Sequence, residues 1–134
     1  MSLTSKVRYP TYDEKCKKLT LEHDIRFAGI LDEHGKLVAG GFKEDIIPLE
    51  DDKKKLSQFM KFISQISLRH ELDKELGPIN YLAARRDRVI LLSFPFPIAK
   101  MTLLISADKS LDIEGLASHV IDVFSSEQAR LAER

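Results

Sequence analysis

The segment from 89 to 94 constrains the fold of this chain more than any other. It reads Val-Ile-Leu-Leu-Ser-Phe, so both sides of an extended strand would be largely apolar. A strand of this kind is stable only where both faces of its sheet are covered. Arg86 and Asp87 precede it and the stretch 95–97 follows it, and both flanks have residues typical of turns. We therefore expect a central strand in a sheet that is covered on both faces.

Two earlier segments, 24–32 and 36–42, have the alternating or small apolar pattern of strands. The four residues from Asp32 to Gly35 join them, with an aspartate that opens a turn and a glycine that accepts a positive φ. We expect the two strands to pair as an antiparallel hairpin. Gly40 and Gly41, at the end of the second strand, indicate a close approach of two backbones.

A short helix is expected before this hairpin. Thr11 and Glu14 have the spacing of a capping box, which predicts a helix that starts at Thr11. Tyr12, Cys16 and Leu19 then form one narrow apolar stripe, as in a helix that lies on a larger body.

A longer helix is expected after the acidic connection 43–52, with Asp51 or Asp52 as its cap. Its first apolar residues lie within about 160° of the helical wheel, which suits packing on a sheet, and we expect all of them in the core. They are Leu56, Phe59, Met60, Phe62, Ile63 and Ile66. A second row, Leu68, Leu72 and Leu76, faces the opposite side. Either the helix continues and exposes this row, or it breaks within 67–70 and turns the row inward.

Gly77 and Pro78 end the helical region. Strands are expected at 79–85, 89–94 and 100–106, joined by short turns as a meander. An amphipathic helix is expected at 113–124, and the polar tail beyond Ser126 is expected to fray.

Composition limits both the organisation of the chain and its partners. Its 134 residues suit one domain spanning 1–134, with flexible ends at about 1–10 and 127–134. Lysine plus arginine equals aspartate plus glutamate at 21 each, so no overall positive field favours nucleic acid. No segment has the length and apolarity of a membrane span, and we expect no membrane insertion. Cys16 is the only cysteine, which fits a reducing compartment, so we expect a cytoplasmic protein.

Motifs for catalysis or cofactor binding are missing from the sequence. His70-Glu71 begins a zinc-peptidase pattern, but Lys74 stands where the second histidine ligand is needed. Glycine-rich phosphate loops and the Gly-x-Ser-x-Gly nucleophile motif do not occur. We expect no enzyme activity, no cofactor and no metal. The basic stretch 85–88 is interpreted as a solvated turn or as a contact for an acidic partner, and 94–97 as a partner-facing apolar tip or as a buried one.

Three parts of the chain resemble the roadblock family, which includes relatives of the dynein light chains and bacterial and archaeal GTPase regulators. Phe-Ala-Gly-Ile-Leu-Asp at 27–32, followed by Gly-Lys-Leu-Val-Ala-Gly-Gly at 35–41, is similar to the opening hairpin of that family. Residues 88–97 and 101–108 resemble its last two strands, and 113–124 resembles its closing helix.

The resemblance, over about residues 12–125, implies an α/β (α+β) fold with the element order α-β-β-α-β-β-β-α. Its five-stranded antiparallel sheet would have the strand order 2-1-5-4-3, the long helix on one face and the terminal helices on the other. Members of the family form homodimers through the long helix and the third strand. Here that interface would consist of Leu68, Leu72, Leu76, Ile79, Tyr81 and Ala83.

The implied function is a non-enzymatic adaptor or regulator that pairs with itself and acts on a small Ras-like GTPase. The alternative is a PAS-like sensor domain that binds a small molecule between helix and sheet. Against it, Phe59, Phe62, Ile63 and Ile66 are bulky enough to fill such a space. A profilin-like binding module has a similar order of elements.

Overall fold

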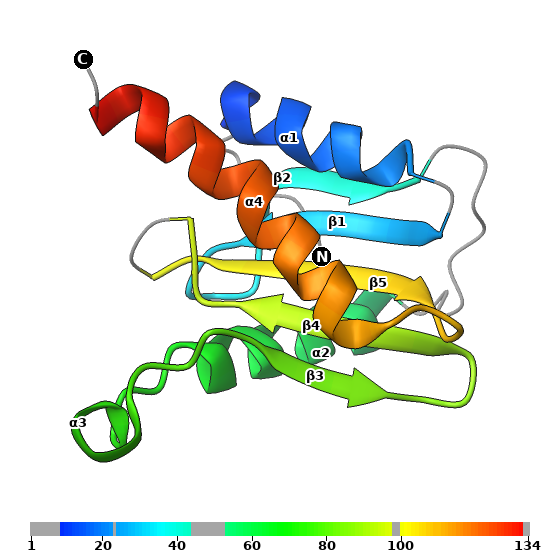
Figure 1. Cartoon of the computed structure of the whole chain (residues 1–134). Coiled ribbons are helices and arrows are strands. Elements are labelled where there is room, and N and C mark those ends of the chain that lie inside the picture. Colours follow the sequence, from blue (N-terminus) through cyan, green and yellow to red (C-terminus); the bar gives the residue numbers. More distant parts are fainter. Residues whose placement is uncertain (1–8, 23, 44–52, 98–99, 133–134) are drawn as a thin grey trace.

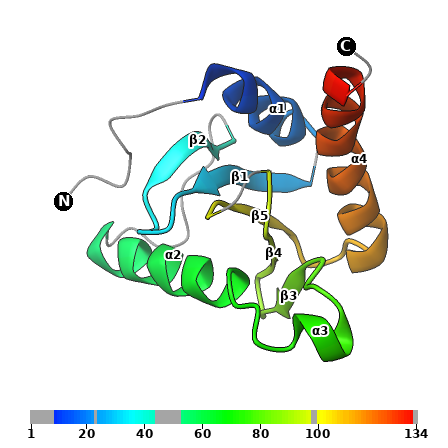
Figure 2. The same ribbon diagram turned by 90° about the vertical axis from the view of Figure 1, so that its left-hand side faces the viewer.

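One antiparallel sheet with helices on both faces makes up the fold (Figures 1 and 2). The computed structural model describes residues 9–22, 24–43, 53–97 and 100–132. The elements in chain order are α1 (Pro10–Thr20), β1 (Ile25–Leu31), β2 (Leu37–Phe42), α2 (Lys53–Ser67), α3 (Asp73–Leu76), β3 (Leu82–Arg85), β4 (Val89–Phe94), β5 (Thr102–Asp108) and α4 (Ile113–Ala132). The strand order is β2-β1-β5-β4-β3, which confirms the expected topology.

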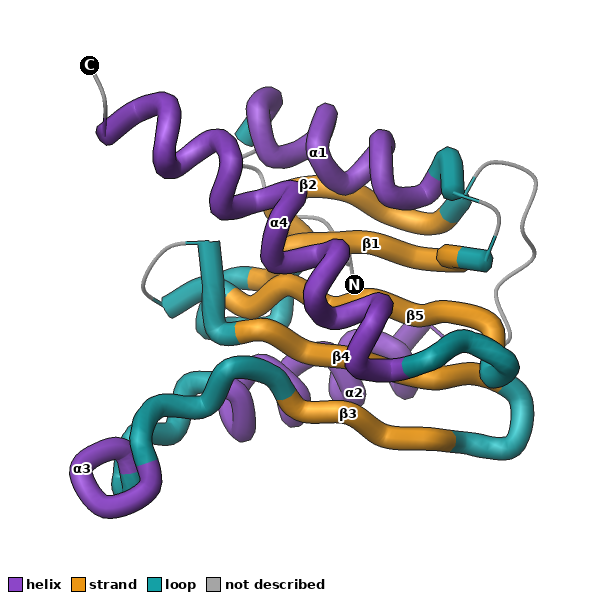
Figure 3. Tube along the Cα trace, viewed as in Figure 1, coloured by secondary structure: helices purple, strands orange, loops and turns teal. Residues whose placement is uncertain are grey.

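The three layers are visible in Figure 3, where α1 and α4 lie on one face of the sheet and α2 on the other. β4 is internal and mostly buried, as expected. The centre of the sheet is nevertheless β5, which is the third strand in the order and has two strands on either side of it. In the part of the chain that the structure describes, no helix is long and apolar enough to cross a membrane.

β3 begins at Leu82, three residues later than we expected. The reason lies in its partner strand. Leu82 pairs with Ser93, and beyond that point the chain turns away, since the Phe96 amide donates to the Phe94 carbonyl at 2.9 Å. Residues before Leu82 therefore have no strand to pair with, and Tyr81 packs its ring against Phe94 instead, at 5.9 Å between centroids.

The β1–β2 hairpin forms as predicted. One carboxylate oxygen of Asp32 accepts hydrogen bonds from the amides of His34 and Lys36, both at 2.9 Å, and Gly35 has a φ of 79°. The close backbone approach at Gly40 is also confirmed. A Cβ there would lie 2.0 Å from the Ala28 carbonyl oxygen, so only glycine fits.

The start of α1 differs from the expected capping box. The helix begins at Pro10, Tyr9 occupies the cap position without a side-chain hydrogen bond, and Thr11 lies inside the helix. Proline suits the first helical position because its missing N–H would be unpaired there anyway. Asp13 instead accepts a hydrogen bond from the Gly40 amide at 2.6 Å, which ties α1 to β2.

Both ends of α4 and the start of α2 were also predicted from the sequence. Asp112 caps α4, since its carboxylate accepts from the Gly115 amide at 2.9 Å. α4 continues to Ala132, whereas we expected it to end near 124 and the tail to fray beyond Ser126. The expected caps Asp51 and Asp52 and nearly all of the acidic connection lie outside the described residues.

The apolar core is divided by the sheet. The larger cluster lies under α1 and α4, where Cys16 and Leu19 are buried as predicted. A chain of aromatic rings crosses this face, with successive centroids 5.2 to 6.5 Å apart. In order the rings are Tyr9, Tyr12, Phe124, Phe96, Phe94 and Tyr81. Phe94 is fully buried and Phe96 partly buried, so the 94–97 segment packs inward. The smaller cluster, under α2, consists of Phe27, Leu31, Leu37, Met60 and Leu104.

Candidate functional site

The orientation of α2 on the sheet is set by the β1–β2 hairpin. Ser64 is fully buried and its hydroxyl donates to the Asp32 carbonyl oxygen at 2.9 Å. Gly35 lies so close that an added Cβ would be 2.5 Å from the Lys61 Cα. These contacts set the rotation of α2 about its own axis. The buried side of the helix is consequently centred near Met60 and Ser64, and not on the middle of its apolar stripe.

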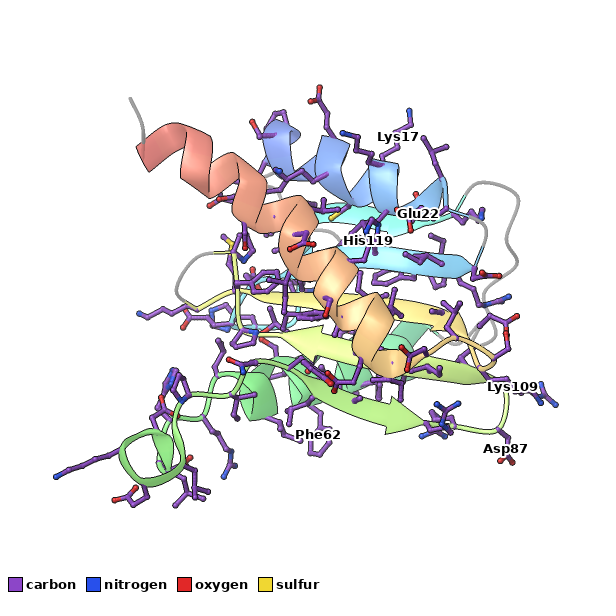
Figure 4. All side chains as sticks on the ribbon, viewed as in Figure 1. Lys17, Glu22, Phe62, Asp87, Lys109 and His119 are labelled. Atoms are coloured by element: carbon purple, nitrogen blue, oxygen red, sulfur yellow. The ribbon has the colours of Figure 1, made fainter. Side chains whose placement is uncertain are left out.

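The same rotation turns Phe62 outward. Its side chain is 58% exposed, so our expectation that it belongs to the core is wrong. In Figure 4 the ring projects from α2 past the β3 side of the sheet, away from the core. Phe62 stood at the margin of the apolar sector of the wheel, and that marginal position was the only sequence signal for its exposure.

The chain leaves the helical path after Ser67, and a single short helix, α3, follows. Neither expected arrangement of the leucine row is found. The helix breaks, yet Leu72 and Leu76 are not turned inward and are 60% and 76% exposed. No residue of α3 is buried, and Figure 1 shows α3 projecting from the body of the molecule. Gly77, with a φ of 83°, ends α3 by donating its amide to the Asp73 carbonyl at 2.9 Å.

The strand that follows α3, β3, is an open edge of the sheet. It pairs with β4 alone, and every residue after Leu82 in the strand is exposed. The Arg86 amide donates to the Val89 carbonyl at 2.9 Å, which makes this pair a hydrogen-bonded one. Because such pairs alternate along an antiparallel ladder, the backbones of Leu82 and Ala84 bond to β4. The N–H and C=O groups of Ala83 and Arg85 then point to the open edge.

We use the term α3–β3 surface for Phe62, Leu72, Leu76 and the open edge at Ala83. Of the predicted interface residues, it contains Leu72, Leu76 and Ala83. Leu68 and Ile79 are half-buried beside it.

Tyr81, the sixth predicted interface residue, is directed toward α4. Its hydroxyl donates a hydrogen bond to the carboxylate of Glu114. That hydrogen bond, followed by partial desolvation and the negative charges of Glu114 and Asp112, raises the pKa of Tyr81 above its ordinary value of 10.0. Tyr81 therefore holds the segment before β3 against the larger cluster, and it borders the α3–β3 surface through its backbone.

The described residues offer no group of three or more His, Cys, Asp and Glu side chains placed to hold a metal ion. His70 makes a local contact instead, with its Nδ1 2.8 Å from a carboxylate oxygen of Asp73. On the opposite face His119 of α4 contacts Glu22, which follows α1 (Figure 4). The described surface has exposed apolar side chains on α2 and α3 and the outward backbone groups of Ala83 and Arg85 on β3, and both features suit contact with another polypeptide.

Comparison with solved structures identifies the fold. A roadblock/LC7 domain from Streptomyces avermitilis is 14% identical, with a TM-score of 0.63 over 90% of this chain and 97% of that one. The gliding protein MglB from Thermus thermophilus is 18% identical, with a TM-score of 0.66 and 97% of each chain covered. An MglB structure with a tetrameric arrangement is 15% identical, with a TM-score of 0.66 over 97% of this chain and 96% of that one.

These similarities confirm the expected roadblock fold. No curated protein matches the sequence. The model of a protein family described as a family of unknown function, DUF6659, matches residues 5–132. The chain therefore belongs to the DUF6659 family and has the fold of roadblock domains.

Proposed function

We propose that this protein is a homodimeric interaction module without catalytic activity, which pairs with a second copy of itself through the α3–β3 surface. The observations that carry the proposal are the exposure of Phe62, Leu72 and Leu76 on the two helices that precede β3 and the unpaired edge of β3 itself. An exposed edge of this kind promotes strand pairing, and natural proteins usually protect it with charge, proline or a covering element. Here the outward-bonding part of β3 begins with alanine and ends with Arg85, and three large apolar side chains are exposed on the helices before it.

A two-fold arrangement satisfies both features. If β3 pairs antiparallel with its copy, the outward N–H and C=O groups of Ala83 and Arg85 gain partners and the two sheets become continuous. The apolar side chains of each protomer then pack against those of the other. The similar MglB with a tetrameric arrangement supports self-association of this fold.

We further propose that the dimer acts in the cytoplasm as an adaptor or regulator, with a small Ras-like GTPase as its partner. The support for the GTPase is the roadblock resemblance, and the support for the cytoplasm is the single, buried Cys16. Each Ras-like protein from the same source would be tested with and without the dimer for changes in nucleotide exchange and hydrolysis. No change in either rate for every such protein would refute this part of the proposal.

The dimer is tested by a cysteine at the edge. In an antiparallel pair centred near Ala83, the two Cβ atoms lie close to the two-fold axis, within about 4.5–5.5 Å for directly opposed residues. We expect Ala83→Cys to form a disulfide-linked dimer under mild oxidation. The matched control is Leu21→Cys, since Leu21 is 75% exposed at the end of α1, on the other face of the sheet. Equal crosslinking of both variants, or a monomer by light scattering at tens of micromolar, would refute the proposal.

A further inference from the structure

A groove of about 730 Å³ opens between α2 and the sheet, toward the end of the sheet that carries the β3–β4 turn. Its volume is in the usual range for small-molecule sites, about 300–1,000 Å³. The groove is formed by the first half of α2, by the α2-facing side of β1, β4 and β5, and by the end of β2. Of the α3–β3 surface, α3 lies past the other end of α2 (Figure 2), whereas β3 borders the groove as well, because Arg85 lines the groove and also belongs to the open edge.

Aromatic rings form the apolar part of the groove. Phe27 lies on β1, Phe42 on β2 and Phe59 on α2. The rings of Phe27 and Phe42 meet edge to face, with centroids 4.9 Å apart. Phe42 is 38% exposed although it packs against another ring, so one side of it remains accessible. Such an arrangement suits a flat apolar group, which would gain both burial and ring contacts.

Arginines form the other part, and strand register places them together. Phe27 pairs with Ser106, which pairs with Leu91 in turn, so the start of β1 and the start of β4 lie at the same end of the sheet. Arg26 precedes Phe27 at an irregularity in the β1–β5 register, and Arg86 and Arg88 belong to the turn before β4. Arg26 on β1 and the two turn arginines therefore lie at the same end of the sheet, on opposite sides of β5.

Among the described residues, no close ion pair holds Arg26, Arg86 or Arg88. The pKa of Asp108 is lowered mainly by hydrogen bonds from Ser110, and the charge of Arg26 contributes a smaller part. Arg85, by contrast, is occupied, because its guanidinium donates to the Lys109 carbonyl oxygen at 2.7 Å.

Two carboxylates lie nearby. Asp87 lies on the same turn and itself lines the groove (Figure 4). Asp108 is held by the amide and the hydroxyl of Ser110 at 2.9 and 2.8 Å, and these hydrogen bonds lower its pKa. The described lining, with four arginines and one aspartate, is thus strongly positive in a chain whose formal net charge is zero.

We propose that this groove binds a small organic anion, with its carboxylate, sulfonate or phosphate at Arg26, Arg86 and Arg88 and a flat apolar body against Phe27, Phe42 and Phe59. The combination of three aromatic rings and four arginines in the lining of one groove carries this assignment. Guanidinium groups pair with planar or tetrahedral anions through two hydrogen bonds at once, which suits a single anionic group.

The test compares two fluorescent probes of nearly the same shape, anilinonaphthalene sulfonate and the neutral phenylnaphthylamine. We expect the sulfonate to bind the full chain more tightly, and its affinity to fall with rising ionic strength. The double reversal Arg86→Glu, Arg88→Glu should weaken the sulfonate by about tenfold or more and the neutral probe little, because charge-assisted hydrogen bonds are lost. The matched control is Arg69→Glu, an exposed arginine after α2 that pairs with Glu71 and does not line the groove.

A second variant, Phe42→Ala, should weaken both probes, because the aromatic surface is common to both. Thermal melts of each variant check that the fold is retained. Equal binding of the two probes, or sulfonate affinity unchanged by the double reversal, would overturn the proposal. Sulfonate binding that appears only after the acidic residues of segment 44–52 are replaced by neutral ones would also overturn it, because the chain's own connection would then be the occupant of the groove. Because Arg85 is shared with the proposed dimer edge, the oligomeric state of each variant would be measured by sedimentation, so that failure of the anion site remains distinguishable from failure of the dimer.

Discussion

Leu72→Asp separates the stability of the protomer from the stability of the proposed dimer. Leu72 occupies the cap position before α3 and makes no side-chain capping bond there. The backbone there (φ −110°, ψ 12°) is not the extended conformation from which an N-cap side chain reaches the first helical amides, so no capping bond is expected. Because Leu72 is 60% exposed, the substitution should change the stability of the folded protomer by no more than about 0.5 kcal/mol.

The dimer should be weakened, and its dissociation constant should rise. Leu72 is 60% exposed in the single chain, so its complete burial at an interface would contribute about 1.2 kcal/mol. A two-fold interface contains this residue twice, which doubles the loss to about 2.4 kcal/mol, or roughly 50-fold in the dissociation constant. Two carboxylates brought into an apolar contact add a desolvation cost, so about 50-fold is the lower limit.

Sedimentation equilibrium across a concentration series measures the dissociation constant, and thermal unfolding at a concentration where the protomer is alone measures its stability. Leu21→Asp serves as the control, because Leu21 is 75% exposed on α1 and lies outside the α3–β3 surface. A dissociation constant that stays within a few-fold of the unaltered chain would refute our assignment of Leu72. The same conclusion would follow if Leu21→Asp weakened the dimer equally.

Three further substitutions address the edge, the Tyr81 contact and the α1–β2 contact. Ala83→Pro removes an outward-pointing amide, so it should abolish the dimer with little change in melting temperature. Ala84→Pro removes an amide bonded to β4, so it should lower the melting temperature clearly. Similar melting temperatures for the two variants would contradict the deduced hydrogen-bond pattern. The pKa of Tyr81 is raised in the folded chain, so its stabilising contribution is complete below about pH 10 and is lost as the pH rises through the raised pKa. Glu114→Gln should shift that loss to lower pH, as followed by tyrosinate absorbance and thermal unfolding, with Tyr81→Phe as the control that removes it. Gly40→Ala should destabilise the fold by about 3 kcal/mol or more, because the new Cβ would lie 2.0 Å from a backbone oxygen at a φ of 78°. Gly115→Ala, where the new Cβ meets only the movable Asp112 carboxylate, should be near neutral by the same denaturant unfolding measurement.

Local signals in the sequence were sufficient for the sheet. The apolar run at β4, the aspartate and glycine of the hairpin, and the turn at Arg86 and Asp87 each act over a few residues, and the structure contains all of them. The expected strand order came from the roadblock resemblance, and it is correct. The late start of β3 could not be predicted, because it depends on where the chain after β4 turns away.

The candidate site was harder to predict, because it depends on contacts between distant segments. Ser64 looks like a polar surface residue in the sequence, yet its hydrogen bond to the Asp32 carbonyl fixes the rotation of α2 and exposes Phe62. The leucine row was correctly recognised as unusual from its place on the wheel. Its environment was not foreseen, since the break after Ser67 creates a separate short helix and does not turn the row inward.

The unequal division of the core by the sheet has a consequence for motion. α1 and α4 rest on a broad apolar cluster and a continuous chain of rings, whereas few of the described side chains of α2 are buried between it and the sheet. Segments with few buried apolar contacts open at lower free energy than the rest of a protein. In hydrogen exchange, the α2 amides should therefore exchange through a partial opening that leaves the sheet and the α1–α4 layer protected. A second protomer or a bound anion would slow that exchange selectively, so the least stable layer would also be the one that reports binding.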